Sequence, residues 1–124
     1  MEINQRTLNI VLRMRNPRRE LNDIRFEYQP SKDTAEGIAQ ELLGTGLIAP
    51  DDVGPMSTNL TQIINNPPPN RVITFRVQTG FSDGDILDEA NLNGFAQLSL
   101  TDWSRHFRTP VNDNIAKVPF RIEI

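Results

Sequence analysis

The sequence predicts an α+β fold, in which two helices pack on one side of a small antiparallel sheet. Runs in which apolar and polar residues alternate occur early and late in the chain, and such alternation is typical of half-buried strands. Between these runs lie stretches in which apolar residues recur every three or four positions, which is typical of amphipathic helices. The expected order of elements is therefore β-β-α-α-β-β, with helices and strands segregated along the chain.

The first two strands are expected to form a hairpin. From Thr7 to Arg15 every second residue is apolar, and the alternation resumes at Ile24, Phe26 and Tyr28. Between the two runs, Asn16-Pro17-Arg18-Arg19 favours a turn because proline restricts φ to a turn value. The two runs should therefore pair as antiparallel strands joined by a basic turn.

The first helix is expected to begin at Thr34. The segment Asp33-Thr34-Ala35-Glu36 fits a capping box, in which an acidic acceptor precedes a glutamate by three residues. Gly44 and Gly46 favour an end near Thr45, and Leu47 should then point back toward the helix. One apolar stripe would run along this helix, formed by Ala35, Ile38, Ala39 and Leu42.

A second helix is expected after Asp51 and Asp52, which would cap its positive end. Gly54-Pro55 should interrupt it, so that its regular part covers Pro55 to Asn65. The proline-rich segment that follows is expected to be an extended linker.

Two further strands are expected at Arg71 to Gln78 and at Phe95 to Leu100, separated by a surface loop from Thr79 to Leu92. The loop is rich in glycine and acidic residues. It lacks the glycine at the sixth position and the distal glutamate that a calcium-binding loop requires, so we interpret it as a solvated connection.

The end of the chain is expected to form an extension of the domain. Residues 1–101 would make up the domain, and residues 102–124 the extension. Phe120, Ile122 and Ile124 alternate with polar residues and predict an added strand, which Pro119 would confine to an edge of the sheet.

The composition excludes several classes of function. The chain has no cysteine and a single histidine, His106, so disulfides, thiolate metal sites and a Ser-His-Asp triad lack their parts. No phosphate-binding loop, GxSxG or HExxH motif occurs, and we expect no catalytic residue, metal or cofactor. A formal net charge of -3 gives no attraction for nucleic acid. No stretch approaches the roughly 18 apolar residues of a membrane span, so a cytoplasmic protein is expected.

Two surfaces are candidates for binding. If the second strand lies along the first helix, acidic and apolar side chains would form an apolar cleft rimmed by carboxylates, suited to a peptide with an arginine beside a bulky apolar residue. The acidic residues are Asp23, Asp33 and Glu41, and the apolar ones are Phe26, Ala35, Ile38, Leu42 and Leu47. Without further information, the residues alone favour the simpler interpretation, in which they form part of the core and the surface of the helix.

The second candidate is the basic hairpin, which carries Arg13, Arg15, Arg18, Arg19 and Arg25. These side chains would either hold phosphate or an acidic partner segment, or only solvate an exposed edge. An assembly module that pairs through Arg13 to Arg19 with a second copy is therefore an alternative function.

Three blocks of the sequence resemble a known family. They are ELNDIRFEY from Glu20 to Tyr28, KDTAEGI from Lys32 to Ile38, and GFAQLS from Gly94 to Ser99. Together they resemble the conserved C-terminal domain of the SPAK / oxidative-stress-responsive / Fray family of serine/threonine kinases, over a span from about Thr7 to about Leu100. Pro50 to Pro69 departs from the family pattern.

The resemblance implies a docking domain that performs no catalysis. It would bind Arg-Phe-x-Val/Ile motifs in WNK kinases and in cation-chloride cotransporters, and so link osmotic and chloride signalling to ion transport. Asp23, Asp33 and Glu41 would hold the arginine of the motif. Its phenylalanine would enter an apolar pocket lined by Phe26, Leu42 and Leu47.

Overall fold

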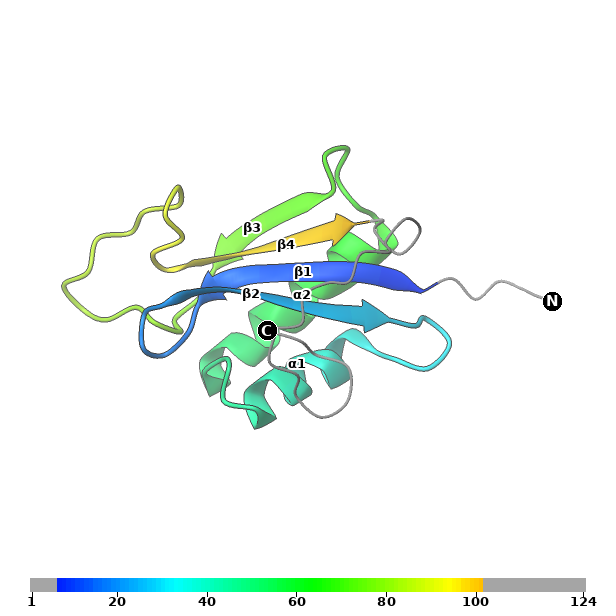
Figure 1. Cartoon of the computed structure of the whole chain (residues 1–124), viewed down its shortest axis with the longest axis horizontal. Coiled ribbons are helices and arrows are strands. Elements are labelled where there is room, and N and C mark those ends of the chain that lie inside the picture. Colours follow the sequence, from blue (N-terminus) through cyan, green and yellow to red (C-terminus); the bar gives the residue numbers. More distant parts are fainter. Residues whose placement is uncertain (1–6, 102–124) are drawn as a thin grey trace, which may run out of the picture.

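The structure, a computed structural model, describes residues 7–101, which form a four-stranded antiparallel sheet with both helices on one side (Figure 1). The predicted α+β class and the order β-β-α-α-β-β are confirmed. The elements are β1 (Leu8–Arg15), β2 (Leu21–Tyr28), α1 (Ala35–Gly44), a 3-10 turn η1 (Pro50–Asp52), α2 (Val53–Asn65), β3 (Val72–Arg76) and β4 (Phe95–Thr101).

The strands lie in the order β2-β1-β4-β3, and every neighbouring pair is antiparallel. The last strand therefore lies between the first and the third, while β2 and β3 form the two outer edges of the sheet that residues 7–101 build. The predicted extra strand at Phe120, Ile122 and Ile124 lies outside the described residues.

The β1–β2 hairpin closes through a three-residue loop with one residue in the left-handed region. Asn16 accepts a bond from the N–H of Arg19 at 2.8 Å, and its own N–H donates to the carbonyl of Glu20 at 2.9 Å. Arg19 has a φ of 69°, so Arg19 and Glu20 both face Asn16 across the ladder and form a bulge. The predicted hairpin is confirmed.

The core lies between the sheet and the two helices. Its most buried side chains have exposed fractions of 2% or less and come from the even-numbered positions of β1, β2 and β4 and from one stripe of each helix. They include Ile10, Leu12, Met14, Ile24, Phe26, Ile38, Leu42, Met56, Leu60, Ile63, Ala96 and Leu98. The odd-numbered side chains of β1 and β2 lie on the opposite face, which no described helix covers (Figure 1).

Helix α1 is capped by Thr34 and not by Asp33, so the predicted capping acceptor was wrong by one residue. The hydroxyl of Thr34 accepts a bond from the N–H of Gly37 at 3.0 Å. Asp33 is instead used one turn earlier, where its carboxylate accepts the N–H of Gln29 at 2.8 Å. This bond to Gln29, which the carboxylate of Asp33 makes in place of a capping bond, closes the chain reversal between β2 and α1.

The end of α1 near Thr45 is confirmed, and glycine explains it. Gly46 has a φ of 81° and donates its N–H to the carbonyl of Leu43, while Leu47 donates to the carbonyl of Leu42, each at 3.0 Å. This pair of bonds is a Schellman motif. It turns the chain so that the partly buried side chain of Leu47 packs back against the core.

The predicted interruption of the second helix at Gly54-Pro55 is wrong. Helix α2 begins at Val53 and runs through Pro55 without a break. Proline is tolerated there because N–H groups in the first helical turn have no partner within the helix. The sequence pattern suggested a breaker because it did not show that Pro55 falls in the first turn.

Asp52 is not the side-chain cap that the sequence suggested. It makes no capping bond to α2, and only 1% of it is exposed. Its carboxylate accepts the N–H groups of Gln78 at 2.8 Å and Thr79 at 2.7 Å, together with the hydroxyl of Thr79. These bonds divert the chain after β3, which ends at Arg76 rather than at the predicted Gln78.

The loop between β3 and β4 folds back on the strands that it joins. The guanidinium of Arg76 lies 5.6 Å from the ring centre of Phe81 and 5.8 Å from that of Phe95. Its Nε donates to the carbonyl of Gly94 at 3.0 Å. The loop is thus held by specific contacts at its base.

Within residues 7–101, no helix is long and apolar enough to cross a membrane.

Replacing Asp52 by alanine is expected to lower the free energy of unfolding by about 3 kcal/mol, because three donors, two of them buried at Thr79, lose a charged acceptor. Urea denaturation of the two proteins measures the difference. Asp51→Ala is the matched control, since Asp51 is an exposed neighbour and its loss should change stability by less than about 0.5 kcal/mol. Equal stability of the two variants would contradict the role assigned to Asp52.

Candidate functional site

The five apolar residues of the predicted cleft belong to the hydrophobic core or pack against it, but they differ in exposure. Phe26, Ile38 and Leu42 are 2% or less exposed and form part of the core. Ala35 and Leu47 are partly buried and leave apolar surface at the two ends of α1. For the three buried residues, the structure agrees with the plain core interpretation. A ligand would meet Ala35 and Leu47 first.

Asp23 does not lie on the same face as this apolar cluster. It is an odd-numbered residue of β2, so its side chain points to the open face of the sheet, away from Phe26. There it forms a two-pronged ion pair with Arg13, its cross-strand neighbour, with Nε to Oδ1 at 2.7 Å and Nη2 to Oδ2 at 3.0 Å. The hydrogen bond and the charge of Arg13 hold the pKa of the Asp23 carboxyl below its usual value.

Asp33 and Glu41 lie on the helix side of the molecule. The carbonyl of Asp33 accepts the hydroxyl of Tyr28 at 2.9 Å, and burial together with the nearby carboxylate raises the pKa of Tyr28. Glu41 lies on α1 and is partly buried. The structure therefore places two of the three predicted carboxylates on the α1 side of β2 and the third, Asp23, on the open face.

A small hollow brings Asp33 together with a carboxylate that sequence reasoning missed. The hollow measures about 130 Å³ and lies at the carboxyl end of β2, where its walls are Glu27, Gln29, Lys32 and Asp33. Glu27 is exposed at the last outward position of the strand. The sequence held one signal for this role of Glu27, which is its position in the ELNDIRFEY block, two residues before the turn that carries Asp33.

Besides Arg13, which pairs with Asp23, two further arginines of the basic hairpin form bonds within the chain. Arg15 donates to the carbonyls of Asn91 and Arg19, with its shortest bond at 2.9 Å. Arg19 pairs with Asp85 at 3.2 Å and donates to the hydroxyl of Ser82 at 3.0 Å. These contacts attach the loop after β3 to the hairpin. Assembly through the hairpin stays a prediction, with Arg18 as its exposed candidate.

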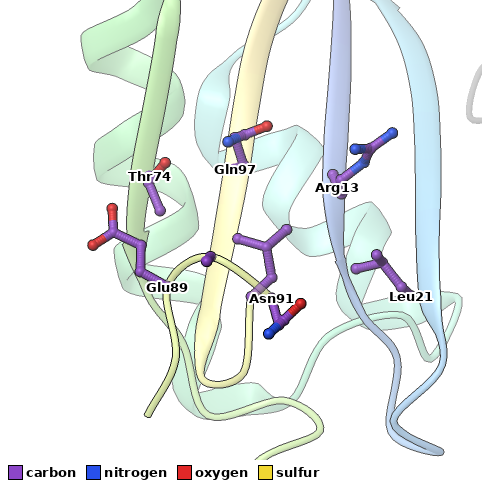
Figure 2. Close-up of a pocket in the computed structure, with 8 residues that line it drawn as sticks. Arg13, Leu21, Thr74, Glu89, Asn91 and Gln97 are labelled. Carbon is purple, nitrogen blue, oxygen red and sulfur yellow. The ribbon is translucent and has the colours of Figure 1, made fainter.

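A larger hollow lies on the open face of the sheet (Figure 2). It measures about 480 Å³, and its lining combines one residue from each of the four strands with residues of the loop before β4. The lining residues are Arg13, Leu21, Thr74, Glu89, Ala90, Asn91, Leu92 and Gln97. Sequence reasoning missed it because these residues become neighbours only when β4 is placed between β1 and β3.

Comparison with known proteins agrees with the resemblance seen in the sequence. Residues 8–65, from β1 to the end of α2, match the family model described as the oxidative-stress-responsive kinase 1 C-terminal domain. Over 99 residues the chain is 48% identical to germinal center kinase 3 of Caenorhabditis elegans. That match covers 77% of this chain but only 17% of the length of the relative.

The lowered pKa of Asp23 predicts how acid affects stability. A carboxyl group whose pKa is lower in the folded than in the unfolded state stabilises the fold at pH values above its unfolded pKa, which is near 3.8. This contribution to stability is lost as the pH falls through the pKa of the folded state. The free energy of unfolding should therefore fall more steeply on acidification in the wild type than in Asp23→Asn. Urea denaturation at several values between about pH 2 and pH 6 measures this.

The control for that experiment is Asp83→Asn, which removes an exposed loop carboxyl instead. If the stability of the Asp23 and Asp83 variants depends on pH in the same way as that of the wild type, the Arg13–Asp23 pair contributes nothing measurable to the pH dependence of stability.

Proposed function

The chain belongs to the oxidative-stress-responsive kinase C-terminal domain family, and we propose that it is a non-catalytic docking domain for peptides that carry an Arg-Phe-x-Val/Ile motif. The proposed ligands are segments of WNK kinases and of cation-chloride cotransporters. The parent protein would be a serine/threonine kinase, which the similarity to a kinase supports.

The observation that carries the proposal is the neighbourhood of carboxylates and apolar surface between β2 and α1. Glu27 and Asp33 line one hollow at the carboxyl end of β2. Ala35, the first residue of α1, follows Asp33 by two positions and is only partly buried. A guanidinium beside an aromatic ring is the ligand that matches such a surface, because carboxylates bind the charge and apolar contacts bind the ring.

The expected strength of binding follows from these two contacts. A hydrogen bond to a charged group contributes roughly 1.5 to 3 kcal/mol, and burial of a phenylalanine contributes about the same amount. After the cost of association, a dissociation constant of roughly micromolar size is expected.

The phenylalanine of the motif would need room that the apolar cluster offers only in part. Phe26, Ile38 and Leu42 are covered, whereas Leu47 follows the Schellman turn and keeps part of its surface accessible. Side-chain rearrangement at an interface is common when partners bind. We therefore expect Leu47 to move and to form the outer wall of the pocket.

Docking would bring a kinase to its activators and substrates. The motif is short and linear, so a domain that holds it can recruit unrelated proteins that share only these residues. In this proposal the domain acts in the cytoplasm and links osmotic signalling to ion transport through the cotransporters that it recruits.

Calorimetric titration with a short Arg-Phe-x-Val peptide tests the proposal. Binding of one peptide per domain is expected, with at least about tenfold weaker binding when the arginine is replaced by alanine or when the domain carries Leu47→Ala. The matched control is Ile73→Ala, which shortens a partly buried side chain on the opposite outer strand, β3, and should leave binding unchanged.

Absence of binding by the folded wild-type domain would refute the docking function. Equal loss in the Leu47 and Ile73 variants would show that the effect comes from general destabilisation and not from the proposed site.

A further inference from the structure

One end of the sheet carries all three of the large apolar side chains that residues 7–101 leave exposed. Leu21 is 45% exposed at the start of β2, and Ile86 and Leu87 are 78% and 46% exposed in the loop after β3. This loop and the β1–β2 turn lie side by side (Figure 1), and the ion pair between Arg19 and Asp85 joins them. Large apolar side chains that gather on one exposed surface are typical of a contact with another protein.

The loop after β3 is held in place on both sides of its exposed apolar residues. The carboxylate of Asp85 binds Arg19 at 3.2 Å and accepts the N–H of Ser82 at 2.7 Å. Leu87 packs so closely on Gly94 that a Cβ added at this glycine would lie 2.6 Å from the leucine side chain. The loop is therefore ordered before any partner arrives, and association costs little conformational entropy there.

Two opposite charges at this end remain unpaired within residues 7–101. Arg18 lies in the turn and Asp83 in the loop, and both are exposed. The side chain of neither forms an ion pair or a hydrogen bond with another described residue. Their neighbours Arg19 and Asp85, by contrast, already pair with each other at 3.2 Å. A positive charge is thus available on the turn and a negative charge on the loop.

A surface of this kind is complementary to itself. In a dimer with a two-fold axis every contact occurs twice, because both copies contribute the same surface. Two copies that meet at this end face each other either turn against turn or turn against loop. The first arrangement would bring Arg18 toward its own counterpart, and like charges repel. The second would pair Arg18 of each copy with Asp83 of the other.

We propose that the chain forms a two-fold dimer through this end, with the turn of each copy against the loop of the other. The apolar side chains of the two copies would be buried in the middle, with Ile86, the most exposed of them, at the centre. The two contacts between Arg18 and Asp83 would lie on either side. The surface is smaller than the roughly 20 to 30 residues that each partner contributes to a stable interface, so the dimer is expected to be weak.

The dimer would leave the docking surface open. Glu27 and Asp33 line a hollow at the carboxyl end of β2, whereas the turn precedes the amino end of the same strand. If the docking function proposed above holds, a partner with two motifs would bind both copies, and its second binding step would be intramolecular. The dimer itself does not depend on peptide binding.

Sedimentation equilibrium of the whole chain over a wide range of concentration tests the dimer. The wild type is expected to shift from monomer to dimer as its concentration rises. Ile86→Asp should weaken association at least about tenfold, because it would bury a charge in the apolar centre. The matched control is Thr58→Asp, which adds the same charge at an exposed position of α2 and should leave association unchanged.

Charge reversal provides a second test, which only contact between copies explains. Arg18→Glu would oppose two carboxylates and Asp83→Arg would oppose two guanidinium groups, so each variant alone should associate at least about tenfold more weakly than the wild type. In an equimolar mixture of the two variants, both contacts join opposite charges again, and association should return to the strength of the wild type. Both positions are exposed, so the fold is expected to persist.

Each outcome decides one part of the proposal. A wild type that stays monomeric at every concentration would overturn the dimer and assign the apolar surface to a different protein. Association that Ile86→Asp does not weaken would show that the copies meet through another surface. A mixture that associates no better than the separate variants would overturn the arrangement of turn against loop. None of these results depends on a peptide, so they leave the docking function to its own test.

Discussion

The pairing of β1 with a strand on each side determines where the functional groups of this domain lie. Its register opposes Ile10 to both Phe26 and Leu100, so apolar side chains from three strands meet on the face that the helices cover. A shift of one residue would move these side chains to the open face and bring Arg13 and Asp23 into the core. Burial of unpaired charge is costly, which makes the observed register strongly favoured.

The same alternation gives the outer strand β2 its two chemically different sides. Its even-numbered residues extend the core toward α1, while Asp23 and Glu27 place carboxylates on the open face. The proposed docking function uses both sides, together with Asp33, which the turn after β2 carries to the start of α1. Binding strength would then come from apolar burial, and direction from the placement of charge.

Local patterns predicted the elements wherever the decisive contact is local. The hairpin, the glycine-terminated end of α1 and the apolar stripe of that helix depend on residues within a few positions of one another, and all are confirmed. Asp52 shows the opposite case, because the donors at Gln78 and Thr79 that bury its carboxylate lie far away in the sequence. The start of α2 was predicted too late because the sequence around Pro55 does not distinguish a proline in the first turn of a helix from one that interrupts a helix.

By itself, the sequence determined the fold class, the order of the elements and the family of this protein, because periodicity, turn residues and the ELNDIRFEY and KDTAEGI blocks are properties of the chain alone. Only the tertiary structure decided which predicted site residues are accessible and on which side of the sheet they lie. It buried Phe26, Ile38 and Leu42, paired Asp23 with Arg13 and made β2 an outer strand of the described sheet. The physical reason is that exposure and edge position depend on which segments pack together, and residues distant in the sequence make those contacts.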